Sequence, residues 1–555
     1  MNTFILGVDF GTLSMRAILF DAKNGDMVVQ HVEPYVHGVM DQDLHGIKLP
    51  YDYALQDPND YLDALIKGIN RLMQSSHVKK EDVIAMGIDF TSCTILPVDH
   101  AFNPLCSQDK FKNHPHAYVK LWKHHSAQKH ADRATSIALE RDEAFIHRYG
   151  NQISSEWMLP KVMEILHEDA TIYQHTHRFM EAGDWIITKL TGKASMSSCQ
   201  AGYKALWHHA QGFPSADYLA ALDQRLVDFY RVKVASEVQE VHSEAGKLSA
   251  VFANQLGLSS GLPVAVAMID AHSAVIGSGI VVPGKMLMIM GTSTCHMVLD
   301  QHEVHLKGIS GVVKNGIVPG LYGYEAGQAS VGDTIDWWVQ HFVPQSYYDV
   351  AKNKNQSIFQ VLNTLIKDKQ EDASGLLSLD WLNGNRSILG NSHLSGLIMG
   401  LTLSTRCEDI YRSLIEATAF GSKKIIDQFE KNGVQIHEIY ASGGIANKNA
   451  LCMEIYANII GKPIHIVQSE QSSALGAAIS ASVAAGTKHG GYANIEEAIH
   501  HMVKKSVEIY HPNESKHQKY KMLYKEYEKI HDFFGIEEKA MMENLKAQKG
   551  GVKHA

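Results

Sequence analysis

The sequence lacks several patterns that each indicate a particular class of protein. Its six cysteines include no CxxC pair, and its 32 histidines include no HExxH motif, so neither a zinc centre nor a disulfide framework is predicted. The longest apolar windows, such as residues 262–269, are far shorter than the roughly 20 residues of a membrane span. The net charge is −9 and no block of Lys and Arg is present, which argues against a nucleic-acid partner.

The N-terminal stretch MNTFILGVDFG has no basic region and reaches Asp9 after a very short apolar run, so it does not predict a signal peptide. The cysteines are scattered through apolar segments and are expected to be reduced, buried thiols. Together these features predict a cytoplasmic protein. With 555 residues, 45% of them hydrophobic, the chain is expected to form two large lobes.

Strand-like and helical segments alternate along the chain. Strands are predicted at 4–10, 14–21, 83–90, 94–98, 263–269, 285–291, 294–299, 437–442 and 464–467. Helices are predicted within 58–75, 120–148, 405–432 and 447–461, and a further helix near the C-terminus has an apolar face of Tyr520, Leu523, Tyr524, Tyr527 and Ile530. This mixture predicts an α/β architecture.

Two strand–turn–strand segments, at 5–21 and 288–300, follow one pattern. Their repetition indicates a duplicated lobe. A Gly/Ser/Pro turn near residue 260 leads from a polar helix into a new strand. We therefore expect lobe one at 1–260, lobe two at 261–535 and a flexible tail at 536–555.

The first hairpin carries residues suited to a phosphate and a metal ion. Gly11 and Thr12 turn the chain, and short side chains there leave backbone N–H groups exposed to phosphate oxygens. Asp9 would supply a carboxylate oxygen to the Mg²⁺ of a nucleotide, and Arg16 would supply a guanidinium to a phosphate. An ordinary hairpin with a surface arginine is the alternative interpretation.

The second hairpin repeats this turn with Gly291, Thr292 and Ser293. A single hairpin of this kind is weak evidence of a phosphate site, but two hairpins with the same small-residue turn favour one. Each hairpin is therefore predicted to hold phosphate groups of the same nucleotide.

A third glycine turn, Gly443-Gly444, follows a strand and opens a helix. Without side chains it permits the flat approach of a ring, beside the N-terminus of the helix. Asn447 and Asn449 would then contact adenine or ribose, although a helix cap explains one of them equally well.

Asp270 ends an apolar strand in the segment AVAMIDAHSAVIG. Open α/β sheets bind ligands beyond the carboxyl ends of their strands, and kinases use a carboxylate to accept the proton of a substrate hydroxyl. With an ordinary aspartate pKa of about 3.9, Asp270 would be a weak base. A helix N-cap is the alternative interpretation.

These residues resemble a known family, the FGGY carbohydrate kinases of the actin/Hsp70/sugar-kinase ATPase superfamily. The resemblance runs through nearly the whole chain, and within the family it is greatest to the kinases of L-ribulose. It is carried by the segments GVDFGTLSMRA, GIDFTSCTILPVD, YVKLWKHHSAQKHADR, ISSEWMLPKVM, AGYKALW, GKMLMIMGTSTCH, GYEAGQASVGD and LDWLNGNRS.

The resemblance implies two ribonuclease H-like lobes around a cleft, with the sugar bound between the lobes and ATP and Mg²⁺ bound mainly by the second lobe. The implied reaction converts ATP and L-ribulose, a ketopentose, to ADP and L-ribulose 5-phosphate, a step of L-arabinose catabolism. Related kinases are often dimers, so a homodimer is implied as well.

Residue roles carried over from the family add to those read from the hairpins. Asp270 is implied as the general base on the terminal hydroxyl of the sugar. The ketopentose-contacting segments contain Ser92, Lys204 and Glu325. The nucleotide-binding segments contain Gly291, Thr292, Ser293, Gly332, Gly444 and Asn449, and the phosphate and metal side contains Asp9, Thr12 and Arg16.

Two alternatives stay open on the sequence. Ser92 stands where an alanine is expected in a kinase of L-ribulose, so a kinase of D-ribulose, xylulose or ribitol is one alternative. The other is a regulator that binds sugar and nucleotide without turnover.

Overall fold

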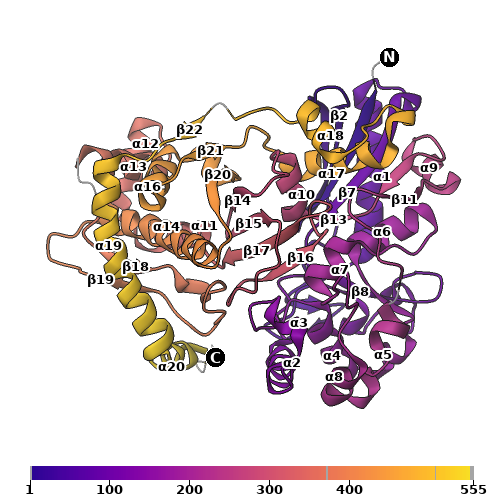
Figure 1. The fold of residues 1–555 in the computed structure, drawn as a ribbon, viewed down its shortest axis with the longest axis horizontal. Coiled ribbons are helices and arrows are strands. Elements are labelled where there is room, and N and C mark those ends of the chain that lie inside the picture. The colour runs from indigo at the N-terminus through magenta and orange to yellow at the C-terminus, as the bar shows by residue number, and fades with distance from the viewer. Residues whose placement is uncertain (1–2, 235, 370–372, 507, 551–555) are drawn as a thin grey trace.

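The computed structural model describes residues 3–234, 236–369, 373–506 and 508–550. Figure 1 shows two halves, with the N-terminal part of the chain on the right and the C-terminal part on the left. The late helices α17 (Ser472–Ala485) and α18 (Ile495–Met502) are the exception, since they return to the N-terminal half.

The first half is built on one mixed sheet. Its strands are β1 (Phe4–Phe10), β2 (Ser14–Asp21), β3 (Met27–Pro34), β7 (Val83–Phe90), β11 (Glu244–Lys247) and β12 (Pro263–Ala265), in the order β11-β12-β7-β1-β2-β3. A short strand, β13 (Met268–Ile269), also pairs with β7. β1 runs antiparallel to β2 and parallel to β7, and β12 is also parallel to β7.

The second half repeats this arrangement. Its strands are β14 (Gly284–Met290), β15 (Thr294–Asp300), β16 (Gly311–Lys314), β17 (Tyr322–Gln328), β20 (Ile436–Ser442), β21 (Ile464–Ile466) and β22 (Ile509–Tyr510), in the order β16-β17-β15-β14-β20-β21-β22. β14 runs antiparallel to β15 and parallel to β20, and β20 is parallel to β21. Strand order and direction therefore match between the sheets, which confirms the duplicated α/β fold.

Helices cover both faces of the first sheet. The helices α1 (Pro58–Ser76), α6 (Ala182–Thr191) and α9 (Ala250–Leu256) share a core with Leu6 and Val8 of β1. The helices α10 (Asp270–Gly277) and α17 pack on the other face, against Ile5. A Cβ on Gly87 of β7 would lie 1.9 Å from the carbonyl oxygen of Ala477, so this close approach of α17 requires glycine.

The second sheet packs against α14 (Cys407–Lys431), α16 (Ala450–Ile460) and α19 (Glu514–Asp532). The apolar face predicted for the last of these helices is confirmed, because Tyr520, Tyr524, Tyr527 and Ile530 are all buried. The helix begins where the Asn513 side chain accepts a hydrogen bond from the Lys516 N–H.

A smaller sheet in the first half positions the loop around Ser92. Its strands are β6 (Leu55–Gln56), β8 (Ile95–Val98), β9 (Val119–Lys120) and β10 (Arg178–Glu181). Other helices near the predicted site residues are α4 (Met158–Glu168), α7 (Ser198–Lys204), α11 (Gly332–Phe342) and α15 (Gly444–Lys448). The other longer helices are α2 (Gln128–Glu140), α12 (Gln345–Lys354), α13 (Ile358–Asp368) and α20 (Lys539–Gly550).

The structure differs from the sequence predictions in several places. The strand predicted at 263–269 is two short strands, β12 and β13, and both pair with β7, so the first sheet continues beyond residue 260. The helix predicted within 120–148 begins only at Gln128. The segment 536–555 contains α20, whose Glu543 accepts a hydrogen bond of 2.7 Å from Asn391; residues 551–555 lie outside the described residues.

All six cysteines are unpaired; four are buried, and Cys295 and Cys407 are half-buried. Within the described residues, no helix combines the length and the apolar character that crossing a membrane requires.

Candidate active site

Three carboxylates lie at one edge of the first sheet. Asp9 in β1 is directly opposite Asp89 in the parallel strand β7. Met268 of β13 is also opposite Asp89, so Asp270 follows two residues later at the same edge. This is the carboxyl edge of parallel strands, where open α/β sheets place their ligands.

Asp89 is the member of this group that the sequence analysis missed. It is fully buried, and neither carboxylate oxygen has a hydrogen-bond partner. Burial, followed by the charges of Asp9 and Asp270, raises its pKa well above the ordinary value. Its position at the end of the apolar strand VIAMGIDF was the available signal, since Asp270 was selected on the same pattern.

Asp9 and Arg16 form an ion pair across the first hairpin. The Arg16 Nη1 group donates to Asp9 Oδ2 over 3.3 Å, and the Nε group of Arg16 is buried without a partner. Burial raises the pKa of Asp9, and the charge of the Arg16 guanidinium opposes this shift. The turn places Thr12 beside Trp122, whose indole N–H donates to Thr12 Oγ1 over 3.2 Å.

Asp270 is the first residue of α10, and its Oδ1 atom accepts a hydrogen bond of 2.7 Å from the Ala271 N–H. The N-cap position belongs to Ile269, so the alternative interpretation of Asp270 as the N-cap does not describe this helix. Burial and then the charge of Asp9 raise the pKa of Asp270 to about 7. The expectation of an ordinary pKa was therefore wrong, and Asp270 is a stronger base than predicted.

Lys204 and Glu325 join the two halves of the molecule. Lys204, at the end of α7, donates from Nζ to Glu325 Oε2 of β17 over 2.8 Å, and both side chains are almost completely buried. His272 of α10 lies 3.5 Å from the same oxygen. Burial disfavours the charged form of Glu325, but its neighbours Lys204, His272 and Arg386 together outweigh burial, and the pKa of Glu325 is about 2.

The loop that carries Ser92 is held by a buried lysine that the sequence analysis did not select. Lys161 of α4 donates from Nζ to the carbonyl oxygens of Cys93, Leu121 and Lys120, over 2.6, 2.9 and 3.2 Å. Burial lowers the pKa of Lys161 to about 8. Ser92 itself is half-buried, and its hydroxyl donates to the Cys93 sulfur over 3.3 Å.

The second hairpin turn packs directly on the start of α11. The Gly332 N–H donates to the Gly291 oxygen over 3.0 Å, and the Val331 N–H donates to the Thr292 oxygen over 2.8 Å. A Cβ on Gly332 would lie 2.6 Å from the Gly291 oxygen. Gly332 therefore belongs to the same constellation as the turn formed by Gly291, Thr292 and Ser293.

The third glycine turn lies beside the second hairpin because β14 and β20 are parallel neighbours. Gly443 has a φ of 96°, and a Cβ there would lie 2.5 Å from the Met290 oxygen. A Cβ on Gly444 would meet no atom within 4 Å, so the turn presents open space at this position. Asn447 is exposed.

Asn449 serves as the N-cap of α16. Its Oδ1 atom accepts hydrogen bonds from the Cys452 N–H over 3.1 Å and from Asn363 Nδ2 over 3.0 Å. The helix-cap alternative therefore holds for Asn449, whereas Asn447 does not cap this helix.

The predicted residues fall into two groups. One surrounds the first-sheet edge and the ion pair between the halves: Asp9, Thr12, Arg16, Ser92, Lys204, Asp270 and Glu325. The other lies at the edge of the second sheet: Gly291, Thr292, Ser293, Gly332, Gly443, Gly444, Asn447 and Asn449. Among the described residues, no hydrogen bond or ion pair joins the first hairpin turn to the second, so their contact with one nucleotide stays a prediction.

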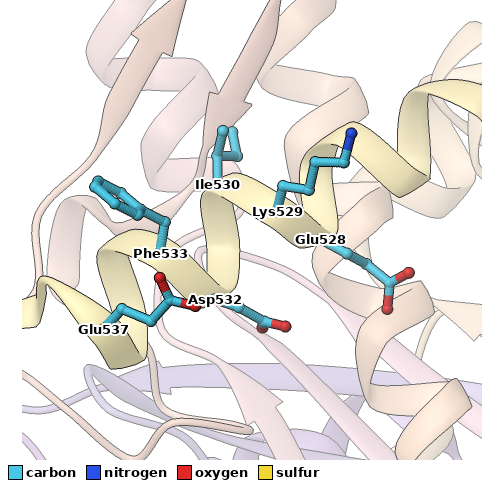
Figure 2. Close-up of a pocket in the computed structure, with 6 residues that line it drawn as sticks. All are labelled: Glu528, Lys529, Ile530, Asp532, Phe533 and Glu537. Atoms are coloured by element: carbon cyan, nitrogen blue, oxygen red, sulfur yellow. The ribbon is translucent and has the colours of Figure 1, made fainter.

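A separate hollow of about 590 Å³ lies along the end of α19 (Figure 2) and is lined by Glu528, Lys529, Ile530, Asp532, Phe533 and Glu537. None of these is a predicted site residue. Glu528 and Asp532 extend to one side of the helix in Figure 2, and both form ion pairs with Lys424 of α14, at 2.9 and 3.6 Å. The hollow is therefore a feature of helix packing, away from the three carboxylates.

Comparison with known proteins identifies two family domains in this chain. The N-terminal domain of the FGGY family of carbohydrate kinases matches residues 4–277, and the C-terminal domain of that family matches residues 286–485. A protein of Halalkalibacterium halodurans named ribulokinase is 46% identical over 548 residues, which cover 98% of this chain and 97% of the relative. A protein of the same name from Geobacillus thermodenitrificans is 46% identical over 545 residues, 98% of this chain and 96% of the relative.

The fold is also that of a solved sugar kinase. The crystal structure of xylulose kinase from Rhodospirillum rubrum matches with a TM-score of 0.78 and 20% identity, over 96% of this chain and 99% of that one. The family match spans both halves of the molecule and includes the three carboxylates and the three glycine turns. This chain therefore belongs to the FGGY family of carbohydrate kinases.

Proposed function

We propose that this kinase transfers the terminal phosphoryl group of ATP to L-ribulose, giving ADP and L-ribulose 5-phosphate. The observation that carries the proposal is the position of Asp270, a carboxylate with a pKa of about 7 beside the buried Lys204–Glu325 pair. The choice of ribulose is supported by relatives named ribulokinase that are 46% identical over nearly the whole chain.

The residues present fit Mg²⁺ at the first-sheet edge. Asp9 and Asp89 are adjacent carboxylates, and both oxygens of Asp89 lack a partner. Mg²⁺ is usually bound by one or two carboxylates together with water and substrate phosphates, which agrees with the finding that no group of three or more ligands is present among the described residues. Bound there, Mg²⁺ would neutralise charge on the ATP phosphates.

ATP would lie along the second-sheet edge. The turn of Gly291, Thr292 and Ser293 offers small side chains, and the open space at Gly444 would admit a flat ring. Asn447 is the better placed of the two asparagines to contact the nucleoside, because Asn449 caps α16. Arg16, whose Nε group is unpartnered, would reach a phosphate oxygen from the first sheet.

The sugar would be bound by Ser92, Lys204 and Glu325. A buried, charged Lys–Glu pair can hydrogen-bond the hydroxyls of a polyol through the donors and acceptors that the pair leaves unused. Asp270 would accept the proton of the terminal hydroxyl while that oxygen attacks the terminal phosphorus of ATP and ADP departs. With a pKa of about 7, Asp270 is half ionised at neutral pH, which is close to the best value for a general base at that pH.

An ADP-release assay across L-ribulose, D-ribulose, D-xylulose, ribitol and glycerol tests the proposal. We expect the highest kcat/KM with L-ribulose. A higher kcat/KM with another pentulose or pentitol would identify that sugar as the substrate in place of L-ribulose. Binding of sugar and ATP without ADP release would favour a regulator without turnover.

We further propose that the reaction takes place in the cytoplasm and that the protein is a homodimer. The six unpaired cysteines support a reducing compartment. Light scattering of the purified protein tests the dimer. A molar mass equal to that of one chain would contradict it.

A further inference from the structure

A loop from the second half of the molecule reaches the sugar side of the site. It runs from Asn385 to Asn391, which exchange two backbone hydrogen bonds of 2.9 and 2.8 Å. The Gly327 N–H of β17 donates to Ser387 Oγ over 3.2 Å. On the other side, Gln152 of the first half donates from Nε2 to the Gly390 oxygen over 2.7 Å. The loop is thus fixed to both halves.

This loop carries Arg386, a cation between two carboxylates. The Nη2 atom of Arg386 lies 3.5 Å from Glu156 Oε2 and 3.6 Å from Glu325 Oε1. Glu156 precedes α4 in the first half, whereas Glu325 is in β17 of the second half. The two glutamate side chains are 15% and 6% exposed, so each has little water to replace a lost cation.

Glu325 therefore receives a cation on each of its oxygens. Lys204 donates to Oε2 over 2.8 Å, and Arg386 faces Oε1. His272, near the same carboxylate, adds no charge at neutral pH because burial lowers its pKa to about 3. The orientation of the Glu325 carboxylate is consequently set by Lys204 and Arg386 together.

An ordinary stabilising salt bridge does not explain Arg386 well. Both of its ion pairs use the single nitrogen atom Nη2 and are longer than the 2.8 Å contact of Lys204 with Glu325, so neither has the short, bidentate geometry of a strong arginine–carboxylate pair. Within the described part of the chain, the Arg386 guanidinium forms these two ion pairs and donates no hydrogen bond. A guanidinium has five N–H donors, so most of its capacity remains for other groups at this position.

We propose that Arg386 is a positioning residue of the sugar site, which orients Glu325 toward the sugar and, through Glu156, ties the two halves together around it. The inference rests on the proposed function, since it takes Glu325 as a sugar contact. Removal of Arg386 releases Glu325 Oε1 and leaves Glu156 without this cation, so sugar binding weakens while the ATP side, at the other sheet edge, is unaffected.

Steady-state kinetics of full-length Arg386→Gln, Arg386→Lys and Glu156→Gln variants test this role. We expect Arg386→Gln to raise the KM for L-ribulose about tenfold, as the loss of one charged contact in a partly buried site implies, and to leave the KM for ATP within about twofold. Arg386→Lys keeps the charge and should recover part of the loss. In a Glu156→Gln background, Arg386→Gln should cause a smaller additional change, because the two residues share one contact.

A matched control is Arg71→Gln, which removes an arginine of α1 whose Nη1 atom lies 2.6 Å from Glu33 Oε2; its KM values should equal those of the wild type. An unchanged KM for L-ribulose in Arg386→Gln, or equal rises for sugar and ATP, overturns the role. If Arg386→Gln does not fold, the KM values of Arg386→Lys are used instead: a rise in the KM for L-ribulose alone supports the role, and an unchanged KM for L-ribulose overturns it.

The wild type is assayed first so that the two proposals fail separately. If the wild type uses another pentulose or pentitol, L-ribulose is rejected as the substrate, and the KM of the same variants is measured with the sugar that is used. A selective rise in that KM supports Arg386, and no selective rise overturns it.

Discussion

Asp270→Asn separates catalysis from stability at one position. The asparagine retains an oxygen that can accept the 2.7 Å hydrogen bond from the Ala271 N–H, so the start of α10 should be unchanged. It cannot accept the proton of the sugar hydroxyl. Loss of a general base typically costs about 10²- to 10⁴-fold in rate, and we expect kcat to fall within that range while the affinity for the sugar changes by less than about tenfold.

The same substitution should change stability in the opposite direction. The pKa of Asp270 is raised from 3.8 to about 7 in the folded protein, so the folded state holds the proton more tightly than the unfolded state. The stability that this proton provides is fully present below about pH 4 and is lost as the pH rises through about 7. At about 1.4 kcal/mol per pKa unit, the ionised carboxylate costs at most about 4 kcal/mol above pH 7, and partial exposure reduces this to about 1–2 kcal/mol.

Denaturant unfolding and ADP-release kinetics, each followed from pH 5 to pH 9, measure both effects. In the wild type, kcat/KM for the sugar should rise about tenfold per pH unit up to about pH 7 and then level off. Asp270→Asn should be more stable than the wild type at pH 8 and should lose this profile. Asp184→Asn is the matched control, because Asp184 is a buried aspartate of α6 whose pKa is also raised by burial; it should be stabilised at pH 8 with little loss of kcat. Wild-type turnover in Asp270→Asn would remove this residue from the mechanism.

Three further predictions concern other residues of the two groups. Lys204→Gln leaves the buried Glu325 without its 2.8 Å donor and should lower the free energy of unfolding by about 3–5 kcal/mol and raise the KM for the sugar; an unchanged melting temperature would contradict the burial argument. Gly443→Ala forces a Cβ to 2.5 Å from the Met290 oxygen at a φ of 96°. Because this displaces the turn, the KM for ATP should rise at least about tenfold. A rise confined to the KM for the sugar would place the nucleotide elsewhere. Asp89→Asn removes a buried carboxylate whose pKa is raised by burial. It should increase both the stability at pH 8 and the Mg²⁺ concentration needed for half-maximal activity. Calorimetric titration of Mg²⁺ in the presence of an ATP analogue measures the Mg²⁺ affinity directly, and an unaltered affinity would exclude Asp89 from the metal side.

Local patterns in the sequence were sufficient for much of the fold. The hairpins β1–β2 and β14–β15 were predicted within one residue of their bounds, because a strand, a short turn and a returning strand depend on neighbouring residues. The duplicated sheet followed from their repetition. The predicted strand at 263–269 was less accurate, since its division into β12 and β13 depends on where β7 lies beside it.

The site divides in the same way. Asp9, Asp270 and the glycine turns were recognisable because each stands at the end of a strand in its own short segment. Asp89 also stands near the end of a strand, but its place beside Asp9 became evident only when β7 was paired with β1, and the role of Lys161 became evident only when α4 was packed against the Ser92 loop. Arg386 meets Glu156 from a position 230 residues later in the chain, and no local pattern encodes that distance.

The sequence by itself determined which segments become strands, helices and glycine turns, and which residue types stand at their ends, because those properties arise among residues close together in the chain. Only the tertiary structure decided the pKa values of the ionisable side chains in the site. The pKa of Asp270 depends on its burial and on the nearby charge of Asp9, and desolvation and Coulomb interactions are set by three-dimensional distance.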